Sequence, residues 1–433
     1  MRSKSASVLP PRRNHMAEGR AFRTRLVALV AVVAFGAWAG WHYVDSTRTD
    51  TQVARFLHQH WLNPLPPQGN PPAQFSALEA SLDPKSCAIC HPAQYREWRS
   101  SLHSHTMGSG ILWQFYLMSQ PDANSCMRCH APLAEQKALM AREFRWSAAP
   151  SEAPPAYVPN DLAHQGLVCA ACHVRHHERF GPPPLPGKPA PSTAGAHGGF
   201  TASKAFEDSR FCAACHQFPA DGPRLNGKLR EDTYAQWRAS RFASEGVTCQ
   251  ACHMPGRRHL WRGIHSPEMV RKAVDVSLSV TTQSATEGLA RAVITNVGAG
   301  HDFPTYMVAK VTVDLDLVSP DGAQVQSLAT RTIGWGVDTN ITHELFDTRL
   351  PPGGRLELGS KFVLPSEADW RLRLRMRVAP REHYERMFAS VLARKEQLGA
   401  DATHTLTEAL AEARATHFEA IELTRACPRR IAN

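Results

Sequence analysis

Five copies of the pentapeptide C-x-x-C-H constrain this chain more than any other feature. They occupy Cys87–His91, Cys126–His130, Cys169–His173, Cys212–His216 and Cys249–His253. In this motif the two cysteines form thioether bonds to the vinyl groups of a haem, and the histidine binds the iron from one face. One copy could arise by chance or form half of a zinc site, but five copies use ten of the eleven cysteines. The sequence therefore predicts five covalently bound haem c groups.

Each residue of the motif has an expected role. Thioether bonds are expected at Cys87, Cys90, Cys126, Cys129, Cys169, Cys172, Cys212, Cys215, Cys249 and Cys252. Proximal iron ligands are expected at His91, His130, His173, His216 and His253. Only Cys427 is left over, so cysteine usage excludes a disulfide scaffold. The motifs are too closely spaced for an ordinary apolar core around five macrocycles, so we expect the haems themselves to form much of it.

The net charge says little about partners. The polypeptide has a formal charge of +10, which alone would favour an anionic partner. Each haem brings two propionates, so five haems would offset this excess, and the chain has no recognised nucleic-acid-binding motif. We therefore expect no nucleic-acid partner. Because bacteria attach haem covalently outside the cytoplasm, we also expect the chain to be exported.

The N-terminus supplies an export signal. Residues 1–25 form a basic segment, and residues 26–44 form an apolar run about long enough to span a bilayer. Basic residues before the run predict a cytoplasmic N-terminus, and aromatic residues at its far end favour the membrane interface. We interpret it as a transmembrane anchor in the bacterial inner membrane, with the haem domain facing the periplasm. The alternative is a cleaved signal peptide, because Ala37-Trp38-Ala39 resembles an A-x-A cleavage site.

Composition divides the remaining chain into four parts. Residues 45–80 are rich in proline and predict an extended tether. Residues 81–270 hold all five motifs and predict a mostly helical or irregular pentahaem domain, with a helix start at Asp83-Pro84. Residues 271–380 alternate apolar and polar side chains and predict an antiparallel β-sandwich of about seven strands. Residues 381–433 return to helical spacing. The expected fold class is a multidomain α+β protein with an N-terminal transmembrane helix.

The second axial ligand of each iron separates electron transfer from catalysis. A second histidine closes the iron, whereas an open face admits a substrate. The candidate distal ligands lie in or beside the haem region, and they are His103, His197, His259, His265 and His301. Methionine could serve instead, and Met107 lies near a motif. Position alone does not say which histidine would serve which haem.

A pattern after the first motif is shared with a known family. The motif is followed by Tyr95, Trp98, Ser101 and His103, and this text resembles the multihaem c-type cytochromes of the cytochrome c-552/4 type. That family is related to the nitrifier tetrahaem cytochrome that accepts electrons from hydroxylamine oxidoreductase, and to hydroxylamine-oxidoreductase-like cytochromes. The resemblance implies that His103 is a distal haem ligand, with His105 as its competitor.

Two further segments extend the resemblance to roughly residues 83–380. Tyr234, Trp237 and Ser240 repeat the pattern before the fifth motif, but Phe242 stands where the ligand histidine would be. The text around His301 resembles a segment of multihaem relatives that have an appended β-domain. This resemblance implies that the β-domain donates His301 to a haem and so locks the two domains together.

These features lead to one main function and one alternative. We expect a membrane-anchored periplasmic pentahaem cytochrome that transfers electrons between respiratory redox proteins, with the quinol pool as a further candidate partner. The alternative is a multihaem oxidoreductase that acts on a small nitrogen or sulfur compound at a five-coordinate haem. Enzymes among the relatives mark the active haem by a lysine-containing motif or a tyrosine crosslink, whereas all five motifs here end in histidine. We therefore expect an electron carrier without a catalytic residue.

Overall fold

The computed structural model describes residues 35, 38, 47–188, 195–367 and 369–430. The chain separates after Phe56 into two compact units, which are considered individually. The predicted basic segment 1–25 lies outside the described residues, and so does the predicted anchor 26–44 except for two positions. Among the described residues, no helix combines the length and the apolar character needed to cross a bilayer.

The motif-bearing part of the second unit consists of short helices and small β-ladders. The helices are α2 (Ala77–Ala80), α3 (Pro84–Ala88), α4 (Pro92–Arg99), α5 (Ser109–Phe115), α6 (Gln120–His130), α7 (Ala134–Glu143), α8 (Cys169–His173), α9 (Arg210–His216), α10 (Thr233–Arg238), α11 (Arg241–Ser244), α12 (Cys249–His253) and α13 (Pro267–Ala273). The strands are β1 (Val174–Arg175), β2 (Glu178–Gly181), β3 (Thr201–Ala202), β4 (Arg224–Leu225) and β5 (Lys228–Leu229). The first motif begins in α3, and the other four lie within α6, α8, α9 and α12. A helical turn suits the motif because residues three apart share one helix face.

Polar caps begin several of these helices. The Asp83 carboxylate accepts a hydrogen bond from the Lys85 N–H at 2.9 Å, directly before Pro84. Ser266 accepts one from the Met269 N–H at 3.5 Å and so caps α13. Such caps satisfy amide groups that the first helical turn leaves without partners. The helix start predicted at Asp83-Pro84 is therefore confirmed.

The predicted tether at residues 45–80 is not extended throughout. Residues 47–60 are helical. Further along, Leu65 is 5% exposed and Gln68 is 2% exposed. The Gln68 N–H donates to the Glu135 carboxylate of α7 at 2.6 Å. The proline-rich chain thus packs onto the motif-bearing helices, because its apolar and amide groups find partners there that the local sequence does not reveal.

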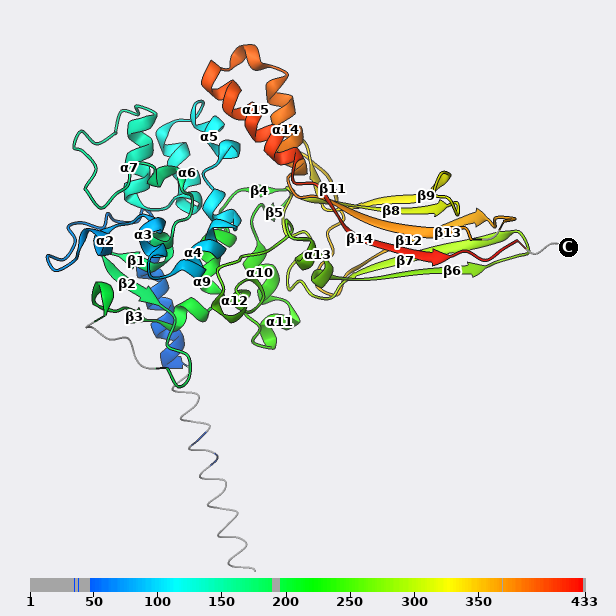
Figure 1. Cartoon of the computed structure of the whole chain (residues 1–433), viewed down its shortest axis with the longest axis horizontal. Helices are drawn as coiled ribbons and strands as arrows, with labels where there is room; N and C mark the ends of the chain where they lie inside the picture. Colours follow the sequence, from blue (N-terminus) through cyan, green and yellow to red (C-terminus); the bar gives the residue numbers. More distant parts are fainter. Residues whose placement is uncertain (1–34, 36–37, 39–46, 189–194, 368, 431–433) are drawn as a thin grey trace, which may run out of the picture. The chain divides into compact units, whose positions relative to one another are not determined.

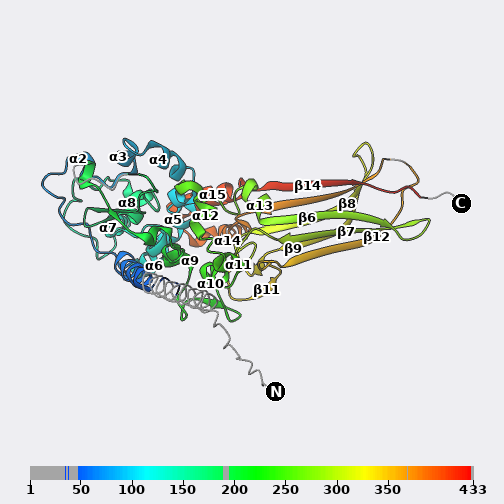
Figure 2. The same cartoon turned by 90° about the horizontal axis from the view of Figure 1, so that it is seen from below.

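The second half of this unit contains two antiparallel sheets packed face to face (Figures 1 and 2). Their orders are β12-β7-β6 and β14-β13-β8-β9. The strands are β6 (Val274–Thr282), β7 (Glu287–Asn296), β8 (Lys310–Val318), β9 (Val325–Ile333), β12 (Arg355–Val363), β13 (Arg371–Ala379) and β14 (Phe418–Ala426), and a hairpin of β10 (Trp335–Val337) and β11 (Glu344–Asp347) forms a smaller sheet. Strand β9 lies beside β12, and β14 lies beside β6. The predicted antiparallel sandwich is confirmed.

Alternating side chains build the core of the sandwich. Leu372, Leu374 and Met376 of β13 are completely buried, and Leu374 pairs with Leu315 of β8. Apolar residues from both sheets join them in one cluster. Successive side chains of a strand point to opposite faces, so the period-two spacing read from the sequence places one face of each strand inward.

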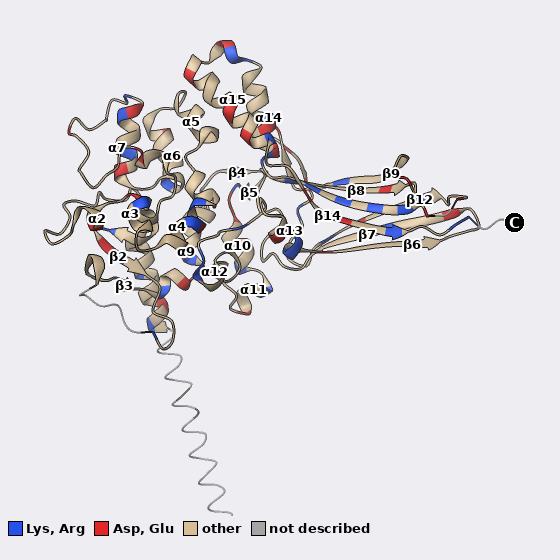
Figure 3. Ribbon diagram, in the orientation of Figure 1, with Lys and Arg blue, Asp and Glu red and all other residues tan. Residues whose placement is uncertain are grey.

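The other face of β13 carries arginines. Figure 3 shows basic residues in bands along the long strands. Arg373 and Arg375 contact Asp316 of β8 at 3.2 and 3.1 Å, and Arg377 contacts Asp314 at 2.6 Å. Both aspartates are buried, so either would be costly to leave without its partner. These cross-strand pairs favour the observed register of β13 on β8.

The C-terminal segment departs in part from the prediction. Helices α14 (Glu382–Leu392) and α15 (Ala400–Arg414) are present as expected, but β14 follows them. The prediction that residues 381–433 are helical is therefore wrong for Phe418–Ala426. Spacing alone fitted a helix, whereas pairing with β13 gives the backbone of this stretch its hydrogen bonds and makes it an edge of the sandwich.

Replacing Leu374 by alanine tests the shared core. The substitution leaves a cavity, so Leu374→Ala should lower the free energy of unfolding by about 2–5 kcal/mol. The control Val363→Ala, at a side chain that is 68% exposed, should change it by less than about 0.5 kcal/mol. Guanidinium unfolding followed by far-ultraviolet circular dichroism measures both. Equal stabilities would contradict the burial of Leu374.

Candidate haem-binding site

Cysteines from different motifs lie next to one another. Three thiol pairs lie close enough to shift each other's pKa, and they are Cys87–Cys169, Cys129–Cys215 and Cys212–Cys249. In each pair the interaction with the partner thiol, followed by burial, raises the pKa of the more enclosed thiol, which is Cys169, Cys215 or Cys212. Each thiol is the expected attachment point of one haem edge. The pairs would therefore bring the edges of different macrocycles side by side.

These contacts define an order among the motifs. Cys172 of the third motif lies close enough to act on the pKa of Cys212 and Cys215 in the fourth, after larger effects of the partner thiols and burial. Together with the thiol pairs, this links the motifs in the order first, third, fourth and fifth. The second motif joins at the fourth, which is thus the junction. This order is not the order along the chain.

The proximal histidines are oriented by backbone carbonyls. The Nδ1 atoms of three of them contact carbonyl oxygens, with His130 on Thr106 at 2.8 Å, His173 on Phe180 at 2.7 Å and His253 on Arg262 at 2.6 Å. In the tautomer that donates from Nδ1, the Nε2 atom keeps its lone pair for a metal. Such a second hydrogen bond is the usual means of orienting a ligand imidazole.

Three motif histidines have another imidazole across from them. The ring centres of His103 and His216 are 6.4 Å apart, those of His253 and His301 also 6.4 Å, and those of His173 and His259 6.1 Å. Two imidazoles on opposite faces of one metal ion, each bound at about 2 Å, have ring centres roughly 6 Å apart. The spacing therefore fits an iron between each pair.

Burial holds three rings of these pairs neutral. Burial lowers the pKa of His103 to about 3, and it lowers the pKa values of His173 and His301 to about 4. The Nδ1 atom of His301 contacts the Asp302 carbonyl at 2.9 Å, and that of His259 contacts the Arg257 carbonyl at 3.1 Å. Neutral imidazole is the form that binds metals, so both the charge state and the orientation of the rings suit haem iron.

The other two predicted distal ligands are placed differently. The charge of His197 lowers the pKa of His91, after the larger effect of burial, which puts His197 near the first motif. Burial lowers the pKa of His265 to about 4, and Arg381 adds to this effect. Within the described residues, neither ring lies across from a motif histidine at the spacing of the three pairs.

The competitors of His103 lie in different surroundings. His105 is exposed. Met107 is 1% exposed and lies in an apolar cluster with Phe115 and Met127. Its thioether therefore fills core space, and the role of His103 as distal ligand stays a prediction.

The two Tyr-x-x-Trp-x-x-Ser segments fold alike. The Trp98 indole donates to the carbonyl two residues before the third motif at 2.8 Å, and the Trp237 indole donates to the carbonyl two residues before the fifth at 2.9 Å. The amides of the same two acceptor residues donate to the carbonyls of His103 and Phe242, both at 2.8 Å. Phe242 thus occupies the place of His103 in the second copy, as the sequence pattern indicated. In each copy these hydrogen bonds connect a helix to the residues directly before a later motif.

Trp261 contacts three of the expected ligands, and no sequence pattern singled it out. Its ring meets His103 at 4.7 Å and His259 at 5.2 Å, both edge to face. Its backbone amide donates to the His253 carbonyl at 3.0 Å. Its φ of 43° lies in the left-handed region, which is strained for a bulky residue. The surrounding contacts thus hold the indole between two ligand rings.

The sequence also indicated no structural role for His60. It is 3% exposed, and its Nε2 contacts the Cys172 carbonyl at 2.8 Å. Burial lowers its pKa to about 3. His60 therefore supports the backbone of the third motif, from a position more than a hundred residues away in the sequence.

Comparison with solved structures identifies a protein of similar fold. The chain is similar to a penta-heme cytochrome c552 from Thermochromatium tepidum, with a TM-score of 0.54 and 18% identity over 80% of this chain and 99% of that chain. A β-glucosidase from Kluyveromyces marxianus matches with a TM-score of only 0.13, at 9% identity over 29% of this chain and 16% of that chain, which carries no argument. No family model matches the chain, and no curated protein matches its sequence. The first likeness shows a multihaem c-type cytochrome fold.

Replacing His103 tests the pairing with His216. His103→Ala should remove one axial ligand and convert about one fifth of the iron from low spin to high spin. His105→Ala is the matched control and should leave all iron unchanged, because that side chain is exposed. Electron paramagnetic resonance of the ferric protein counts both species. A high-spin signal from the His105 variant alone would reverse the assignment.

Proposed function

We propose that the protein is a membrane-anchored periplasmic pentahaem c-type cytochrome that transfers electrons between respiratory redox proteins, with the quinol pool as a further candidate partner. The ten motif cysteines and five motif histidines would hold five haem c groups, which supply one-electron chemistry when bound. The observation that carries the proposal is the set of three imidazole pairs. Each joins a motif histidine to a histidine from elsewhere at the separation that one iron requires.

From these pairs we propose distal ligands for three haems. His259 would serve the third haem, His103 the fourth and His301 the fifth, while His197 is proposed for the first. With both axial positions occupied, an iron exchanges electrons without binding a substrate. The third, fourth and fifth motifs are also the ones that neighbouring cysteines connect in succession. Closed sites in a row are what a relay requires.

Intact-mass analysis tests the cofactor content. Protein matured in a host that attaches haem c should carry five added haem groups, because each motif supplies two thioether bonds. Cys249→Ser with Cys252→Ser should reduce the number by one and leave the other four in place. A mass equal to that of the bare polypeptide would refute the proposal.

A second function is supported around the second motif. Burial raises the pKa of Tyr306, on which the charges of Tyr384 and Arg381 also act. Tyr384 is 39% exposed, and the charge of Cys126 raises its pKa after the larger effects of desolvation, Arg381 and Glu231. Two phenols and a guanidinium thus gather near the attachment site of the second haem. Within the described residues, His130 has no imidazole across from it at the spacing of the three pairs. A second haem with an open face, acting on a small nitrogen or sulfur compound, is the alternative function.

His265 would decide between the two functions. The charge of Arg381 acts on the pKa values of His265, Tyr306 and Tyr384, so His265 lies near the same tyrosines. If His265 closes the second haem, the native protein should contain only low-spin iron, and His265→Ala should create about one fifth high-spin iron. If that haem is open, the high-spin signal should already be present in the native protein and should respond to added cyanide. Paramagnetic resonance of both proteins, with and without cyanide, separates these outcomes.

The proposed anchor has its own test. Removing residues 1–44 and supplying a cleavable signal peptide should move the haem-loaded protein from the membrane to the soluble periplasmic fraction, because residues 26–44 would provide its apolar span. Haem staining of the fractions measures this. Membrane retention of the truncated protein would assign the association to another part of the chain.

A further inference from the structure

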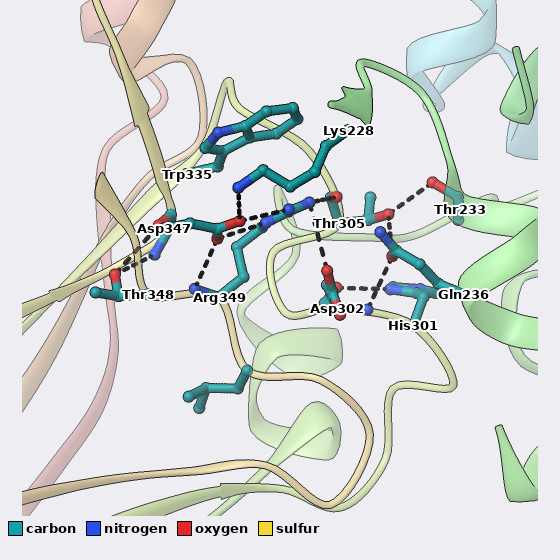
Figure 4. A network of polar contacts seen from close by, with 12 residues as sticks. Lys228, Thr233, Gln236, His301, Asp302, Thr305, Trp335, Asp347, Thr348 and Arg349 are labelled. Atoms are coloured by element: carbon teal, nitrogen blue, oxygen red, sulfur yellow. Dashed lines mark hydrogen bonds and ion pairs between the residues drawn. The ribbon is translucent and has the colours of Figure 1, made fainter. Parts of the chain in front are cut away.

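His301 lies in the loop between β7 and β8, which the motif-bearing helices contact from one side (Figure 4). The Gln236 side-chain oxygen on α10 accepts a hydrogen bond from the Asp302 N–H at 3.0 Å and a second from the Thr305 hydroxyl at 3.3 Å. The hydroxyls of Thr233 and Thr305 share a hydrogen bond of 2.6 Å. One amide thus receives two donors from the loop that carries the proposed ligand of the fifth haem.

The sandwich holds the same loop from the other side. Arg349 donates to the Thr305 carbonyl at 2.8 Å and lies 3.4 Å from the Asp302 carboxylate. Asp347 accepts two hydrogen bonds from this guanidinium at 2.9 and 2.8 Å, and Trp335 stacks on it at 4.5 Å. The Arg349 side chain is only 7% exposed. The loop therefore has a rigid support on the sandwich side.

A third set of contacts joins the two supports. Lys228 of β5 forms ion pairs with Asp347 and Glu344, both at 2.6 Å, and lies over the Trp335 ring at 5.0 Å. Asp347 is thus shared between Lys228, from the motif-bearing part, and Arg349, from the sandwich (Figure 4). The network runs without a break from α10 through the loop to the β10–β11 hairpin.

The loop has no room to shift toward α10. A Cβ atom at Gly300 would lie 3.1 Å from the Trp237 ring and 3.2 Å from the Phe242 ring. Such contacts are tighter than ordinary packing, so the backbone beside His301 already touches the second Tyr-x-x-Trp-x-x-Ser segment. Hydrogen bonds at Gln236 therefore fix the orientation of the loop, while packing of Gly300 against Trp237 and Phe242 sets how closely the loop approaches α10.

We infer that Gln236 is a positioning residue for the fifth haem: by accepting the Asp302 N–H and the Thr305 hydroxyl, it holds the His301 imidazole opposite His253. The inference rests on the proposed role of His301 as distal ligand. It adds that ligation of this haem depends on the docking of the sandwich on α10. The spin state of one haem then reports whether the two parts of the chain are in contact.

Four variants of the full-length, haem-loaded protein test this. His301→Ala is the reference, and it should convert about one fifth of the iron to high spin. Gln236→Leu keeps the size of the side chain but removes the acceptor, so it should give the same high-spin species in part or in full. Gln236→Glu retains an acceptor oxygen and should restore the low-spin iron. Arg241→Ala is the control, because Arg241 contacts the Val297 carbonyl at the start of the same loop at 3.2 Å and not the His301–Thr305 segment, and it should change nothing.

The outcomes separate the two claims. If His301→Ala leaves all iron low spin, His301 is not a ligand and the proposed assignment fails. If His301→Ala creates high-spin iron but Gln236→Leu does not, the assignment stands and the positioning role is wrong. Equal effects of Gln236→Leu and Arg241→Ala would also overturn the positioning role, since general weakening of the interface would then explain the high-spin iron.

A second readout does not depend on the iron. Amide hydrogen exchange at Asp302 should be faster in Gln236→Leu than in the native protein, and Gln236→Glu should restore the protection. If Gln236→Leu fails to accumulate, Thr233→Val removes only the hydroxyl contact to Thr305 and should raise exchange in the same loop. Unchanged exchange in the variant that can be prepared would refute the inference.

Discussion

Hydrogen bonds between imidazole Nδ1 atoms and backbone carbonyls are the interaction on which the rest of the site depends. They involve three motif histidines and also His197, His259 and His301. In the tautomer that donates from Nδ1, each bond orients its ring and leaves the Nε2 lone pair available to a metal. Because the carbonyls belong to the main chain, the orientation of the ligands is set by the path of the loops and helices around them.

His103 is oriented in another way. Its Nδ1 is buried without a hydrogen-bond partner among the described residues, but its carbonyl accepts the amide two residues before the third motif. Trp261 packs against its ring. Backbone attachment and aromatic packing thus replace the Nδ1 hydrogen bond at this ligand. The same backbone attachment recurs at Phe242, whose side chain has no ligand atom, so the segment is a structural unit that carries a histidine in only one of its two copies.

The sandwich serves the site through one loop. Its core and its cross-strand arginine–aspartate pairs make a rigid support, from which Arg349 holds the segment after His301. Residues in the motif-bearing part, chiefly Gln236 and Lys228, hold the same segment from the other side. With His301 as the proposed distal ligand, the geometry of one haem would be coupled to the contact between the two parts of the chain.

Sequence reasoning predicted what depends on local pattern. The strand at Arg371–Val378 followed from period-two alternation, and the helix at Asp83-Pro84 followed from cap chemistry. It was wrong at residues 418–426, where the spacing of apolar residues fits a helix as well as a strand. Pairing with β13 makes this segment a strand. Sequence reasoning also missed the helix at residues 47–60 and the burial of His60. The residue that His60 contacts, Cys172, lies far away in the sequence, so the neighbouring residues give no sign of it.

The sequence by itself determined the chemistry of this protein. Ten cysteines and five histidines in a fixed covalent pattern specify attachment of haem wherever they stand, because each motif is complete within five residues. Only the tertiary structure decided which motifs are neighbours and which histidine faces which other. Those relations join residues far apart along the chain, from His103 with His216 to His253 with His301, and they arise from packing and backbone hydrogen bonds that no local spacing encodes.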